Sequence, residues 1–78
     1  MTNTQRDVLK YRLDLVMRNL RTQHSGADVH EVGNMLNSAT MIMEVINEDL
    51  ETLDIIEARV KKIEGQQVAF FKRKFDIY

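Results

Sequence analysis

The chain has 78 residues, a net charge of −1, and neither cysteine nor proline. A chain this short holds one domain at most, and the lack of cysteine excludes a disulfide scaffold and a zinc site with thiolate ligands. Only three glycines are present, and the many leucine, isoleucine, glutamate, lysine and arginine residues favour helix throughout. We therefore expect a single all-α domain spanning residues 1–78.

The first predicted helix covers about residues 4–23. Thr4 and Asp7 have the spacing of a loose capping box, in which side chains of the first turn satisfy free backbone groups. An apolar stripe follows at helical spacing. It consists of Leu9, Leu13, Val16 and Leu20. A turn is predicted at 24–27, because Gly26 can adopt the left-handed backbone that ends a helix.

A heptad repeat from Val32 to Ile77 predicts a second, much longer helix at about residues 28–75. With Val32 at position a, eleven of the fourteen a and d positions are apolar, and no proline interrupts them. The three exceptions are Asp49, Gln67 and Lys74. One competing geometry is a bend at residues 64–67 that folds 66–78 back as a third helix.

The unequal lengths of the two helices predict self-association. At about 1.5 Å per residue, the second helix would span roughly 70 Å and the first roughly 30 Å. Apolar residues beyond the first helix then need another molecule, because burying each contributes roughly 1.5–3 kcal/mol. The predicted interface consists of Leu53, Ile56, Val60, Ile63, Phe70, Phe71, Phe75 and Tyr78. The expected fold is an antiparallel helical hairpin that assembles into a coiled-coil-like multi-helix bundle.

Charge is segregated along the chain. Residues 1–27 carry five cations and two acids, for a net +3. Residues 28–57 carry eight acids and no lysine or arginine, and residues 58–78 carry six cations and two acids, for net charges of −8 and +4. Such patterning selects helix partners and registers. An antiparallel homodimer is favoured, because it places the acidic centre of one chain opposite the basic end of the other.

Some residues have both a structural and a functional interpretation. Asp49 at a d position marks either the place where water enters beyond the first helix, which we favour, or a polar residue that fixes register. Four methionines are interpreted as core filler, with adaptable partner binding as the second interpretation. They are Met17, Met35, Met41 and Met43.

No catalytic, cofactor or metal site is predicted. Two histidines and two carboxylates cluster near the turn, but their spacing matches no ligand motif and they also suit a turn and a helix start. They are His24, Asp28, His30 and Glu31. The chain has no nucleophile elbow and no glycine-rich phosphate loop. A non-enzymatic protein is expected.

The C-terminal segment 70–75 mixes aromatic side chains with Lys72, Arg73 and Lys74. Bases stacking on phenylalanine and phosphates binding the cations would make it a nucleic-acid contact. An amphipathic segment on an anionic membrane is a further interpretation. The favoured interpretation is that the aromatic rings belong to the bundle core and the cations keep the segment soluble.

The absence of a secretory signal and of an apolar run of about 18 residues predicts a cytoplasmic protein without a membrane span. The expected function is that of a small regulator that binds itself and another protein, as an adaptor, assembly chaperone or inhibitor. The alternative is a nucleic-acid-binding module. A more distant interpretation is a site for catalysis or ligand sequestration formed only between protomers.

Overall fold

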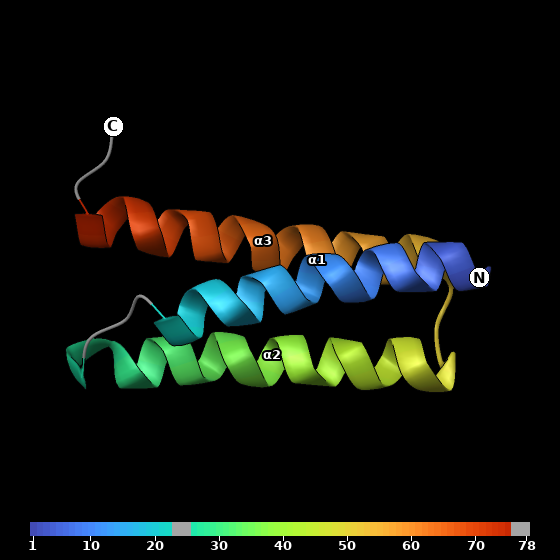
Figure 1. Cartoon of the computed structure of the whole chain (residues 1–78), viewed down its shortest axis with the longest axis horizontal. Helices are drawn as coiled ribbons and strands as arrows, with labels where there is room; N and C mark the ends of the chain where they lie inside the picture. The colour runs from blue at the N-terminus through green and yellow to red at the C-terminus, as the bar shows by residue number, and fades with distance from the viewer. Residues whose placement is uncertain (23–25, 76–78) are drawn as a thin grey trace.

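The computed structural model describes residues 1–22 and 26–75, which form a bundle of three helices measuring 38 × 23 × 17 Å. The helices are α1 (Asn3–Thr22), α2 (Val29–Glu48) and α3 (Leu53–Phe75), with a short 3₁₀ turn, η1 (Gly26–Asp28), before α2. Helices α1 and α3 run in the same direction and α2 runs opposite to both (Figure 1). The predicted all-α class is confirmed, and the described residues contain no strand.

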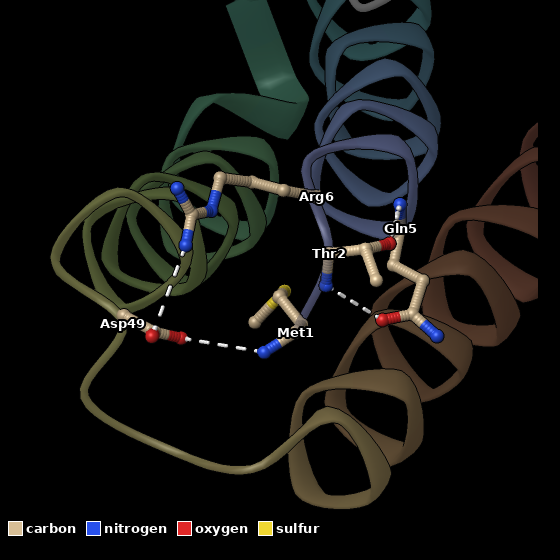
Figure 2. A network of polar contacts seen from close by, with 5 residues as sticks. All are labelled: Met1, Thr2, Gln5, Arg6 and Asp49. Carbon is tan, nitrogen blue, oxygen red and sulfur yellow. Dashed lines mark hydrogen bonds and ion pairs between the residues drawn. The ribbon is translucent and has the colours of Figure 1, made fainter.

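Helix α1 begins with a capping box. The Thr2 amide donates to Gln5 Oε1 at 2.8 Å, and the Gln5 amide donates to Thr2 Oγ1 at 3.1 Å (Figure 2). This reciprocal pair satisfies two backbone amides that the first turn leaves without helical partners. The prediction that Thr4 and Asp7 form the box was therefore wrong by two residues, although the helix it was meant to start is present.

The predicted continuous helix over 28–75 was wrong, because the chain reverses at residues 49–52. Asp49 adopts the left-handed conformation, with φ 54° and ψ 43°. The Leu50 amide donates to the Val45 carbonyl at 3.1 Å and the Asp49 amide donates to the Ile46 carbonyl at 3.3 Å. These two bonds form a Schellman motif, which satisfies carbonyls at the end of a helix and turns the chain away from its axis.

Asp49 occupies a position at which glycine is the usual residue, and its side chain contacts α1. Its carboxylate lies 4.0 Å from the Met1 amine and 3.8 Å from the Arg6 guanidinium (Figure 2). Aspartate tolerates the left-handed region better than most residues do. A carboxylate at a helix C-terminus is disfavoured by the helix dipole, and the two neighbouring cations offset that effect. Asp49 therefore ends α2, and neither interpretation from the sequence had assigned it that role.

Helix α3 continues straight through Gly65, where the competing geometry had placed a bend. Gly65 lies within Leu53–Phe75, and no glycine in the described residues has a positive φ. A third helix does fold back, but it begins at Leu53. The three helices therefore have similar lengths of 20, 20 and 23 residues. The length mismatch that predicted a second molecule does not exist.

One core fills the space between the helices. The heptad pattern predicted which residues of Val32–Phe70 are buried. The apolar a and d positions in this range are buried, with the exception of Leu53. The core residues are Leu9, Leu13, Val16, Met17, Leu20, Val32, Met35, Ala39, Ile42, Ile46, Ile56, Val60, Ile63 and Phe70. Within residues 1–22 and 26–75, no helix combines the length and the apolar character that crossing a membrane requires.

Candidate protein-binding groove

The predicted interface residues do not lie on one exposed surface. Ile56, Val60, Ile63 and Phe70 are buried in the core of their own chain. Leu53 and Phe71 are half-buried and pack against that core, Phe75 is 47% exposed, and Tyr78 lies outside the described residues. The four buried side chains no longer need a second molecule, so the reason for which an interface was predicted there has been removed.

Two of the three cations of the predicted nucleic-acid contact are paired with acids of η1 and α2. Arg73 donates to Glu31 and Lys74 donates to Asp28, which ties the C-terminal end of α3 to the start of α2. Lys72 is exposed. The aromatic rings of this segment contact one another, with Phe71 stacked on Phe75 at 5.8 Å and set edge-on to Phe70 at 5.1 Å. The three cations therefore do not form one open basic patch.

Three of the four residues in the possible metal cluster are described, namely Asp28, His30 and Glu31, and His24 lies outside the described part. Asp28 and Glu31 contact Lys74 and Arg73. In the described residues, no three histidine or acidic side chains are placed to share a metal ion.

The side of α3 that faces α1 is closed by an ion pair. The Arg12 guanidinium donates two bonds to the Glu64 carboxylate, at 3.0 and 2.5 Å. Both side chains are about two-thirds buried, with exposures of 29% and 35%. Hydrogen bonding to Arg12 lowers the pKa of Glu64 below its ordinary value, and the same bonds raise the pKa of Arg12. Such a bidentate pair fixes the geometry of the two helices and satisfies both charges.

The side of α2 and α3 that faces away from α1 is open, and a groove of about 410 Å³ runs between the two helices. We call it the α2–α3 groove. No residue of α1 lines it. Its floor is apolar and consists of Met41, Ile42, Val45, Leu50 and Ile63. A smaller hollow shares Ser38 and Gln66 with it and continues towards the start of α2, between Glu31 and Arg73.

The two walls of the α2–α3 groove carry opposite charges. Glu44 and Glu48 line it from α2, and Arg59 and Lys62 line it from α3. Arg59 also contacts Glu51 at 2.9 Å. Within residues 1–22 and 26–75, no ion pair involves Glu44, Glu48 or Lys62. The groove thus has an apolar floor, an acidic wall and a basic wall whose charges are not neutralised across it.

Two large apolar side chains of the groove project into solvent. Met41 is 66% exposed and Leu50 is 63% exposed. Of the four methionines interpreted as core filler, Met17 and Met35 are buried and Met43 is partly buried against the core, whereas Met41 is exposed. Other exposed apolar residues do not line either hollow. They are Val8, Tyr11, Val29, Ile55, Val68 and Phe75.

Sequence reasoning did not find the groove. Met41 falls at position c of the heptad, outside the apolar a and d positions on which the interface prediction was based. The signal of the groove in the sequence was Met41, a large flexible apolar residue between Thr40 and Glu44 on an otherwise polar helix face. Comparisons with protein-family models, curated proteins and solved structures found no match to this chain.

Proposed function

We propose that this protein is a non-enzymatic helical module that acts by binding another polypeptide in the α2–α3 groove, as an adaptor, assembly chaperone or inhibitor. The observation that carries the proposal is the combination of an apolar floor with two walls of opposite charge. Amphipathic helices bind in such grooves, with apolar anchors about one turn apart entering the floor.

The charges of the walls specify which helix fits. A helix lying in the groove would place basic residues beside Glu44 and Glu48 and acidic residues beside Arg59 and Lys62. The opposite orientation would bring like charges together, which costs several kcal/mol at a close interface. Met41 strengthens the proposal, because a flexible, polarizable side chain adapts its shape to a bound surface.

A library of amphipathic helical peptides tests the proposal. Peptides selected on the wild-type chain should carry an apolar stripe with a basic edge and an acidic edge. In NMR spectra, they should shift the amide signals of residues 38–48 and 59–66. A Met41→Lys, Leu50→Lys variant should lose this binding while remaining folded, because both side chains are exposed.

The matched control is a Val8→Lys, Tyr11→Lys variant. These residues are 51% and 63% exposed, so the control adds the same charge on an apolar surface outside the groove. It should bind the selected peptides as the wild type does. Failure to select any peptide, or binding that the Met41 and Leu50 changes leave intact, would contradict the proposed function.

Nucleic-acid binding at the end of α3 is the second candidate. Its support is the Phe75 ring, which is 47% exposed and has the Lys74 amine 6.0 Å from its centroid. The contacts of Arg73 with Glu31 and of Lys74 with Asp28 weigh against it. Retention on single- and double-stranded DNA should fall steeply with salt if phosphates are bound, and Lys72→Ala should reduce the slope by about 1. No retention at low salt would exclude this candidate.

A further inference from the structure

We propose that a second copy of this chain covers the α2–α3 groove, so that the grooves of the two copies face each other across a two-fold axis that runs along them. In this dimer α2 of each chain packs against α3 of the other, and the four helices form an antiparallel bundle. The inference rests on the proposed role of the groove as a protein-binding surface. A helix from any other protein that enters the groove then competes with the second copy.

Charge complementarity identifies the occupant. Helix α2 contains no lysine or arginine, and the charged residues that line its side are Glu44 and Glu48 in the groove and Glu31 in the smaller hollow. The charged residues that line the α3 side of the groove are Arg59, which also contacts Glu51, and Lys62. In the smaller hollow, Arg73 is already paired with Glu31 of the same chain. The chain therefore carries both the surface and its electrostatic complement, side by side on one face.

Symmetry decides how two such faces can meet. A two-fold axis parallel to the helices places the α2 wall of one copy over the α3 wall of the other, at the same height, so that Glu44 faces Lys62 and Glu48 faces Arg59. An axis perpendicular to the helices places acidic wall on acidic wall and basic wall on basic wall. Like charges directly opposite each other destabilise an interface, so the axis lies along the groove.

The molecule is large enough on this side for a dimer. A stable interface of standard size buries roughly 800 Å² on each partner, and the molecule extends 38 × 23 Å when viewed down its shortest axis, with α2 and α3 at the two edges and α1 in front of them (Figure 1). The side proposed for the dimer is the opposite one, which α1 does not line. At its centre the dimer covers Met41 and Leu50, the most exposed apolar side chains on this face. The charged walls then become the rim on either side of an apolar centre, as in other protein interfaces.

The dimer is tested by reversing the charges of one wall at a time. The oligomeric state of each variant is measured by sedimentation velocity over a range of protein concentrations. The wild type should dimerise. The variant Glu44→Lys, Glu48→Lys has two basic walls, and the variant Arg59→Glu, Lys62→Glu has two acidic walls. Each variant alone should dimerise at least roughly 30-fold more weakly than the wild type. An equal mixture of the two should form a heterodimer, because each acidic wall then meets a basic one.

The mixture also controls for folding, because a variant that had failed to fold could not be rescued by the other. A matched control is Asp7→Lys with Asp54→Lys, which changes net charge by the same amount at exposed positions outside the groove. It should dimerise like the wild type.

Disulfide trapping tests the direction of the axis, and the natural chain has no cysteine to interfere. Ser38 and Gln66 lie at the same height on opposite walls. An equal mixture of Ser38→Cys and Gln66→Cys chains should form the mixed disulfide faster than either symmetric one. Faster formation of the two symmetric disulfides would indicate the perpendicular axis and overturn the proposed arrangement.

Two further results would overturn the inference. If the wild-type chain stays monomeric up to about 1 mM but still binds the selected peptides in the groove, the proposed dimer is wrong and the proposed function stands. Dimerisation that survives both charge reversals would place the interface on another face.

Discussion

The two sides of α3 differ in whether their charged side chains are paired within the chain. Towards α1, Arg12 and Glu64 form a bidentate pair over a packed core, and both charges are satisfied within the chain. Towards the outer side of α2, Glu44 and Lys62 line an open groove and contact no opposite charge within residues 1–22 and 26–75. The first side links two helices of the bundle, and the second is the side that we propose for binding. Substitutions on the two sides should therefore have different effects.

The largest difference is expected between a core residue and a groove residue. Leu13 is fully buried, so Leu13→Ala should lower the free energy of unfolding by roughly 2–5 kcal/mol through lost contacts and the cavity left behind. Met41→Ala, at a 66% exposed position, should change it by less than about 0.5 kcal/mol under conditions where the chain is monomeric. Urea denaturation of dilute protein measures both. Equal effects would contradict the division between the two sides.

Gln67 should be the easiest place to strengthen the inner side of α3. It occupies an a position of the heptad, and its buried Oε1 accepts no hydrogen bond. An unsatisfied buried carbonyl costs about 1–3 kcal/mol. Gln67→Leu should therefore raise the free energy of unfolding by about 1–2 kcal/mol in urea denaturation. A loss of stability would show that the carbonyl is satisfied in solution.

The ion pair between α1 and α3 should contribute about 0.5–1 kcal/mol, as partly exposed pairs do. Because the folded-state pKa of Glu64 lies below its ordinary value of 4.5, the contribution is present above about pH 4.5. It is lost as pH falls through the lower folded-state value. The stability difference between the wild type and Glu64→Gln should therefore shrink between neutral pH and about pH 3.

The exposed pair of Arg18 and Asp14 within α1 provides the matched control for Glu64→Gln. Arg18 and Asp14 are separated by 3.0 Å, and their side chains are 65% and 49% exposed. Arg18→Gln should cost no more than about 0.3–0.5 kcal/mol. A larger loss from Arg18→Gln than from Glu64→Gln would contradict the view that the link between helices is the stronger one.

A modest gain in stability is expected at Gly65, on the exposed side of α3. A Cβ atom added there meets nothing within 4 Å, and alanine favours helix over glycine by about 0.5–1 kcal/mol. Gly65→Ala should raise the thermal midpoint by a few degrees, as measured by circular dichroism. A lowered midpoint would indicate that the chain uses a bend at Gly65 after all.

The heptad pattern predicted which side chains are buried but not the path of the chain. Ile46 and Ile56 keep their register on either side of residues 49–52, and both are fully buried. Periodicity counts residues along the chain, so a straight helix and two helices joined by a register-preserving turn give the same pattern. The turn itself uses Asp49 where glycine is expected, and its stability depends on Arg6, more than forty residues away. Local sequence contains no signal of that contact.

The charge pattern predicted an antiparallel pairing of acidic and basic segments between two chains, and the structure shows such a pairing within one chain. The pairing between chains stays a prediction. The acidic segment does lie antiparallel to the basic one, with Glu31 beside Arg73 and Asp28 beside Lys74, but both belong to one chain. The groove could not be predicted in the same way, because it depends on which face α1 leaves uncovered. That choice follows from the packing of three helices together and not from any one of them.

The apolar heptad register is interrupted at Asp49 but continues on both sides of residues 49–52, and this has a consequence for how the bundle could exchange parts. Straightening that connection would leave Ile46 and Ile56 on the same side of a single rod, ready to be covered by the first helix of a neighbouring molecule. Short connections of this kind are the usual hinges of domain swapping. The contacts from Met1 and Arg6 to Asp49 link the hinge to α1. High salt, which screens such contacts, should therefore favour exchange between chains.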